Sequence, residues 1–84
     1  MQELFLERAV TEDNTGVLEP VITAAYSLDP ITPFELSVIA NKVNRQLGYE
    51  LFEDFGYERL RLDVSRVARA VQLNAVKDLR QEVE

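Results

Sequence analysis

Apolar residues recur at helical spacing along most of this chain, and short polar segments separate the periodic stretches. The stretch from Gln2 to Val10 fits a short amphipathic helix, although an alternating strand fits it equally well; we favour the helix. The segment Thr11–Gly16 is polar and rich in turn-forming residues, so the first element is expected to end there.

A second helix is predicted by apolar residues at i, i+3, i+4 and i+7 between Leu18 and Ala25. Pro20 is expected in the first turn of this helix, where its missing N–H is not needed and its fixed φ suits the helix. Glu19 beside it lies near the positive end of the helix dipole. The segment 29–33 contains two prolines and must then break the helix.

The next helix carries the clearest signals at both of its ends. Thr32 is a natural N-cap, Pro33 falls at the first helical position, and Glu35 completes a T-x-x-E capping box. Gly48 supplies a left-handed cap at the other end. Between these ends, an apolar stripe predicts the buried face of the helix, which consists of Leu36, Ile39, Ala40, Val43 and Leu47.

An aromatic and acidic segment, residues 49–57, follows this helix. We interpret it as a short helix that Gly56 ends, with its rings covering the core, because a small core needs every ring that it can bury. The alternation of acids and rings is also typical of segments that enter a partner's groove, an interpretation that we place second.

From about Glu58 the chain is predicted to be helical to its end, which makes this the longest helix. Residues 60–64 also alternate between apolar and charged, so a short strand followed by an Asp63-capped helix is the competing assignment. In the helical assignment, the core stripe contains Leu60, Val64, Val67, Val71 and Ala75 and drifts toward Val76, Leu79 and Val83.

Together these elements predict an all-α fold, a compact small bundle of about four helices with a long C-terminal helix. Residues 1–84 are expected to form a single helical domain, since domains usually hold about 100–200 residues and a second core has no room. The predicted core contains Leu18, Val21, Ile22, Ala25, Leu36, Ile39, Val43, Leu47, Phe52, Phe55, Leu60, Val64, Val67 and Val71.

Composition removes several classes of function. The chain has neither cysteine nor histidine, which excludes disulfide scaffolds, zinc fingers, haem and iron–sulfur sites, and Ser-His-Asp or Cys-His catalysis. The carboxylates, including Glu12 with Asp13, lack the spacing of a calcium loop. The three glycines form no phosphate-binding motif, and both lysines lie on predicted wet faces. We therefore expect a protein that is not an enzyme and holds no metal or cofactor.

Nine Lys and Arg against fifteen Asp and Glu give a net charge of −6, which is distributed unevenly. Residues 1–56 carry ten acids and three bases, whereas residues 57–84 carry five acids and six bases. An acidic surface repels nucleic-acid backbones and anionic lipid. No apolar run approaches the roughly 20 residues that a membrane span needs, so we expect no membrane association and a cytoplasmic location.

The most informative feature is the outer face of the final helix. Five of the nine cations fall within about a quarter turn, opposite the core stripe, and two leucines share that arc. A solvated face with two stray leucines is the structural explanation. A docking surface is the functional explanation, because arginine beside exposed leucine suits a protein interface. The candidate partner-binding residues are Arg59, Leu62, Arg66, Arg69, Leu73, Lys77 and Arg80.

These observations predict a non-catalytic protein–protein interaction or assembly module that binds a protein partner, or a second copy of itself, through this basic face. We favour self-association as a homodimer, because the acidic and basic halves of two copies can pair antiparallel. The alternative is a small helix-turn-helix-like nucleic-acid-binding regulator that uses the same face, although the tight turn between helices 33–47 and 63–79 is missing. No small-molecule substrate is expected.

The stretch 31–60 contains Gly48-Tyr49, then Phe55-Gly56-Tyr57 and Leu60. With these residues the stretch, about a third of the chain, resembles the LOTUS class of winged-helix modules. That resemblance implies binding of RNA or of a helicase. The extra helix before Pro30 departs from the family's pattern.

Overall fold

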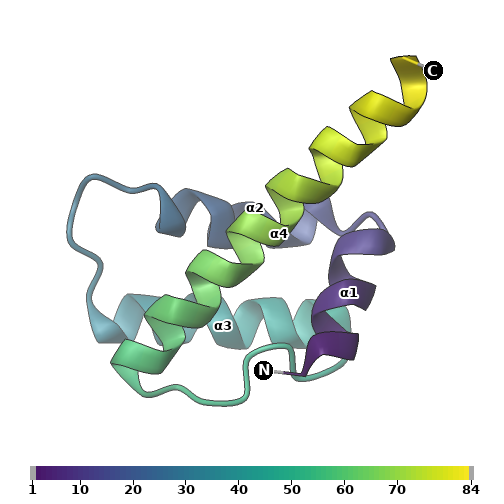
Figure 1. The fold of residues 1–84 in the computed structure, drawn as a ribbon. Coiled ribbons are helices and arrows are strands. Elements are labelled where there is room, and N and C mark those ends of the chain that lie inside the picture. The colour runs from purple at the N-terminus through teal and green to yellow at the C-terminus, as the bar shows by residue number, and fades with distance from the viewer. Residues whose placement is uncertain (1, 84) are drawn as a thin grey trace.

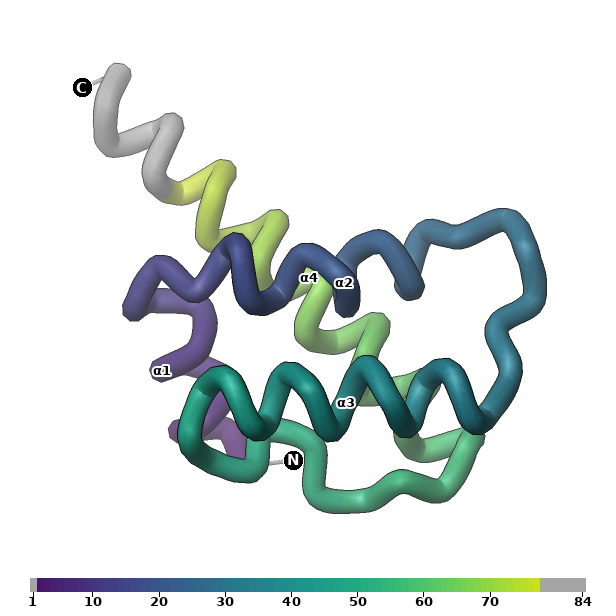
Figure 2. Tube along the Cα trace, turned by 180° about the vertical axis from the view of Figure 1, so that it is seen from behind, coloured from purple at the N-terminus to yellow at the C-terminus, as the bar shows by residue number. Residues whose placement is uncertain are grey.

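The computed structural model describes residues 2–83, and the side chains of residues 2–77. Within these residues the fold is all-α, which confirms the predicted class, and no strand is present. α2 and α3 lie side by side, α4 crosses both of them, and α1 stands beside α4 at one end of the bundle (Figures 1 and 2). The helices span Glu3–Thr11 (α1), Thr15–Ala25 (α2), Pro33–Leu47 (α3) and Tyr57–Val83 (α4).

α4 is the helix on which α1, α2 and α3 all pack. Its 27 residues extend about 40 Å at 1.5 Å per residue, close to the longest dimension of the molecule, 44 Å. The continuous helix from Tyr57 contradicts the competing strand over 60–64, and Asp63 is buried within the helix rather than at an N-cap. The predictions for Leu79, Arg80 and Val83 concern side chains outside the described residues.

The first two helices confirm one prediction and correct another. Residues 3–11 form a helix and not the alternative strand. α2 begins at Thr15, because the Asn14 carbonyl accepts a hydrogen bond from the N–H of Leu18 at 2.9 Å. The residues just before Leu18 therefore belong to the first turn of the helix. Pro20 therefore lies inside α2 rather than in its first turn. Because proline has no backbone N–H, α2 lacks one intrahelical hydrogen bond at this position.

Both ends of α3 are formed by the residues that predicted them. The N–H of Glu35 donates to the Thr32 hydroxyl at 3.2 Å, Pro33 occupies the first turn, and Gly48 adopts a left-handed conformation with φ 84°. The capping box is half formed, because the Glu35 carboxylate makes no return bond to any described residue. These contacts are local in sequence, which is why the pattern revealed them.

The predicted short helix over 49–57 is wrong, because residues 49–56 form an irregular loop between α3 and α4 and Tyr57 begins α4. The side-chain amide of Asn44 holds the loop: its Oδ1 accepts the N–H of Phe52 and its Nδ2 donates to the Phe52 carbonyl, both at 2.9 Å. Leu51 and Phe52 are thereby buried against the core. Phe55, which was predicted to lie in the core, is 37% exposed and lies outside it.

The core lies where α2, α3 and α4 meet, and it confirms most of the predicted positions. Of the predicted residues, Leu18, Val21, Leu36, Val43, Phe52, Leu60, Val64 and Val67 are buried, and Ile22, Ala25, Ile39, Leu47 and Val71 are partly buried. Ala40, which the predicted stripe places on the buried face of α3, is also buried. Buried apolar residues that the prediction omitted are Ala9, Leu51 and Ala68. Among the described residues, no helix combines the length and the apolar character needed to cross a membrane.

Candidate interaction surface

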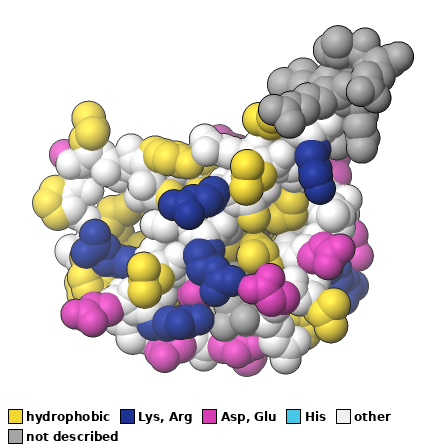
Figure 3. All heavy atoms as spheres, in the orientation of Figure 1, with side chains coloured by type: hydrophobic (Ala, Val, Ile, Leu, Met, Phe, Trp, Pro, Cys, Tyr) yellow, Lys and Arg dark blue, Asp and Glu magenta, His cyan; other side chains and the backbone are white. Residues whose placement is uncertain are grey.

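The outer face of α4 brings together the residues predicted to bind a partner. Basic and hydrophobic side chains are interleaved along this helix (Figure 3). The side chain of Arg80 lies outside the described residues, and the role of the others in binding stays a prediction. The described members, all exposed, are Arg59, Leu62, Arg66, Arg69, Leu73 and Lys77.

Arg59 makes an ion pair within the helix itself. Its Nε lies 3.4 Å from Oδ1 of Asp63, whose side chain is only 1% exposed. Neither carboxylate oxygen of Asp63 accepts a hydrogen bond. A buried charge without hydrogen bonds is costly unless an opposite charge compensates it. Arg59 therefore supports the fold, in addition to bordering the outer face.

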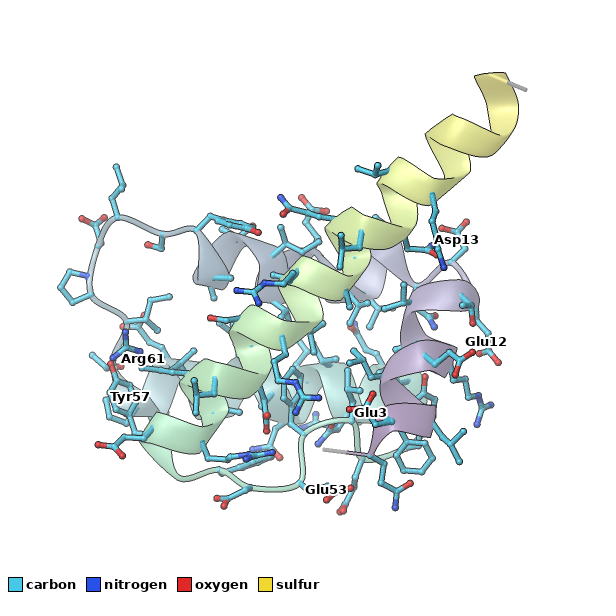
Figure 4. The ribbon with its side chains drawn as sticks, in the orientation of Figure 1. Glu3, Glu12, Asp13, Glu53, Tyr57 and Arg61 are labelled. Atoms are coloured by element: carbon cyan, nitrogen blue, oxygen red, sulfur yellow. The ribbon has the colours of Figure 1, made fainter. Side chains whose placement is uncertain are left out.

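Arg66 ties α4 to α1. Its Nη2 lies 2.7 Å from Oε1 of Glu3, and both side chains are solvent-accessible. Glu3 lies at the start of α1, on the side toward α4 (Figure 4). An exposed ion pair of this kind contributes about 0–1 kcal/mol, so the pair fixes the position of α1 more than it stabilises the bundle.

Arg69 and Lys77 make no ion pair or hydrogen bond with any described residue. Apolar side chains flank them, since Leu73 is 62% and Val76 is 47% exposed. The predicted core stripe is thus wrong at Ala75 and Val76, which are both exposed. Here α4 has passed the end of the core that it packs on.

A groove of about 660 Å³ separates α1 from this part of α4. On the α1 side, the acidic residues Glu3 and Glu7 line it together with the apolar Leu6 and Val10. On the α4 side, the lining is apolar and basic, with Leu73, Val76 and Lys77. The groove therefore has an acidic wall and a basic wall, and both walls also carry apolar residues.

The sequence prediction missed the acidic wall. Glu3 and Glu7 stand one helical turn apart on α1, which places them on the same face of that helix. Nothing in the local pattern shows that this face borders α4, because all contacts between the two helices join segments that are distant in the sequence.

The described residues show no cluster typical of a metal site. They include no group of three or more acidic side chains placed to hold a metal ion. In this part of the chain, a pKa shift is found at Tyr49, where burial raises the pKa above 10.0 and the nearby Arg8 guanidinium opposes the rise. The ring of Tyr49 packs on that of Phe5 in α1.

No family model, curated protein or solved structure matched the chain. The likeness to the LOTUS class therefore rests on a few residues, and two features of the fold differ from a winged helix. The described residues contain no strand from which a wing is built. In addition, the irregular loop 48–56 joins α3 to α4 in place of a tight turn.

Proposed function

We propose that this protein is a non-catalytic assembly module that forms a homodimer through the face built from α1 and α4. The observation that carries the proposal is the groove between these helices, whose two walls differ in charge. A two-fold symmetric interface uses the same surface on both copies, so that surface has to be complementary to itself. An acidic strip beside a basic and apolar strip meets this requirement.

The orientation of the second copy follows from the charges. A two-fold axis that runs along the groove puts α1 of one copy over α4 of the other, acid on base. An axis across the groove instead puts α1 on α1, where Glu3 and Glu7 repel their own copies. The first arrangement is the favourable one, and it runs the two α4 helices parallel rather than antiparallel.

The register follows from the contact between α1 and α4 within one copy. Glu3 pairs with Arg66, so the start of α1 is level with that residue, and the two helices rise in the same direction (Figure 1). Glu7, one turn later, is then level with Arg69. We expect Glu7 of each copy to pair with Arg69 of the other.

The apolar residues supply the driving force. Leu62 is 61% exposed and Leu73 is 62% exposed on the same outer face of α4. A stable interface buries about 800 Å² on each partner, about 13% of the 5936 Å² that this chain exposes. The interface therefore has to include the outer face of α4 as well as the groove.

Charge exchange between two variants tests the interface. Glu7→Arg and Arg69→Glu should each weaken self-association, because each homodimer then opposes like charges. An equimolar mixture of the two should recover association, since the mixed dimer restores both pairs. Sedimentation velocity over a concentration series, at low and at high salt, measures each species. Lys42→Glu, on the exposed side of α3, is the control and should behave as the unmodified chain.

Two outcomes would remove the proposal. One is a monomer at high micromolar concentration in low and in high salt. The other is a dimer that neither reversal weakens. The nucleic-acid alternative has its own signature, because binding to duplex DNA through several phosphates weakens with salt with a slope of about −0.9 per contact. No binding to mixed DNA or RNA at low salt would exclude that alternative.

A further inference from the structure

A second groove, of about 560 Å³, opens between α2 and α3. These two helices lie side by side in front of α4 in the rear view (Figure 2), and no described residue of α4 lines this groove. Its apolar lining comes from partly buried side chains of α2, α3 and the loop between them. These are Pro20, Ala24, Ile31 and Ile39.

Three carboxylates surround this apolar lining. Glu19 belongs to α2, Glu35 to the first turn of α3, and Asp29 to the connecting loop at one end of the groove. All three residues are exposed, and none of their carboxylates makes an ion pair or hydrogen bond with a described residue. The lining contains no lysine or arginine. The two long walls of the groove are thus both negative.

The charge of the surrounding chain strengthens this local field. Residues 12–56, which include α2 and α3, carry eight acids and two bases, a net charge of −6. That value equals the net charge of the whole chain. A cleft lined by one sign of charge attracts ligands of the opposite sign and repels anions such as phosphate.

We infer that this groove binds a basic amphipathic helix of a partner protein. Apolar residues at i, i+4 and i+7 of that helix enter the groove, in the way that amphipathic helices occupy apolar grooves elsewhere. Lysines or arginines on both flanks of its apolar stripe face Glu19 on one wall and Glu35 on the other. The surface is separate from the α1–α4 face, so this inference does not depend on the homodimer.

A synthetic peptide provides the probe. A fluorescent helix with leucines at i, i+4 and i+7 and lysines on both flanks should bind the full chain, as measured by anisotropy, and more weakly as salt rises. A second peptide with serine in place of each leucine keeps the charge and should not bind. Equal affinity for the two peptides would show attraction to net charge alone and would overturn the inference.

A matched pair of variants locates the site. Glu19→Lys with Glu35→Lys should weaken binding of the leucine peptide by about tenfold or more, because two attractions become two repulsions. Glu50→Lys with Glu58→Lys changes the net charge equally, and Glu58, like Glu35, is an acid in the first turn of a helix. This control should bind nearly as the unmodified chain. Equal losses in both variants would refute the location.

The same variants distinguish a partner protein from a second copy of this chain. The basic face of α4 is itself an amphipathic surface that could occupy the α2–α3 groove of another copy. Such a contact joins two different surfaces, so each copy can bind a further copy and the assembly grows as an open chain. The inference predicts that Glu19→Lys with Glu35→Lys leaves sedimentation of the chain unchanged. Loss of species larger than a dimer in this variant would identify another copy as the occupant and overturn the assignment to a partner.

Discussion

The link between Asn44 and the loop 48–56 gives the sharpest stability prediction. Asn44→Ala removes two hydrogen bonds of 2.9 Å and leaves the backbone N–H and C=O of Phe52 without these partners. An unsatisfied buried group costs about 1–3 kcal/mol. Asn44 and Phe52 border a surface hollow, so water can replace part of what is lost and each group should cost close to the lower value. We expect a loss of about 2 kcal/mol.

Urea denaturation and thermal melting followed by circular dichroism measure this loss. In a domain of this size, 2 kcal/mol corresponds to a decrease of about 8–16 °C in Tm. Asn41→Ala is the matched control, because Asn41 is exposed on the same helix, borders the same hollow and makes no side-chain hydrogen bond with a described residue. Both substitutions raise helix propensity by the same amount. The difference between their free energies of unfolding therefore measures the two hydrogen bonds between Asn44 and Phe52. Stabilities within about 0.5 kcal/mol of each other would refute the reasoning.

Three further predictions concern stability. Arg59→Ala should lower the free energy of unfolding by about 1–3 kcal/mol, because the Asp63 carboxylate then stays buried without an opposite charge. Asp63→Leu should leave the free energy of unfolding unchanged or raise it. If urea denaturation finds Asp63→Leu less stable than Arg59→Ala, this account is contradicted. Thr32→Ala should cost about 1 kcal/mol through loss of the N-cap, and an unchanged Tm would show that the cap contributes nothing. Burial raises the pKa of Tyr49 above 10.0. The contribution of the protonated Tyr49 hydroxyl to the free energy of unfolding is therefore complete below pH 10.0 and is lost as the pH rises through the raised pKa. Tyr49→Phe should remove this part of the alkaline loss of stability, and identical alkaline profiles for both proteins would argue against it.

The parts of the fold that could be predicted are those whose signals are local. Thr32, Pro33 and Gly48 determine both ends of α3 through contacts with residues at most four positions away. The apolar spacing of α4 likewise predicted its core face as far as Val71. At Ala75 and Val76 the apolar spacing continues, but both side chains are exposed. Sequence periodicity carries no information on where a neighbouring helix ends.

Two of the errors come from side-chain contacts that the apolar pattern does not show. Residues 49–57 have a composition suited to a helix, but the amide of Asn44 satisfies the backbone of Phe52 in an irregular conformation. Asp63 fits the pattern of a helix cap, yet it is buried in α4 and compensated by Arg59. In both cases a single side-chain contact decides the outcome.

The candidate surfaces divide in the same way. The shared outer face of the α4 cations followed from helical geometry alone. The grooves could not be predicted, because each is formed by two helices whose adjacency depends on packing. Glu7 and Glu19 gained a possible role only when their neighbours across a groove were known.

The position of α4 in the chain has a consequence for how the protein is made. α1, α2 and α3 leave the ribosome before the helix on which all three pack, and the Glu3–Arg66 contact closes across 63 residues. Until α4 emerges, the nascent segments lack the surface that shelters their apolar side chains. We therefore expect this fold to form only after α4 has been synthesised, with the earlier helices exposed to chaperones and proteases in the interval.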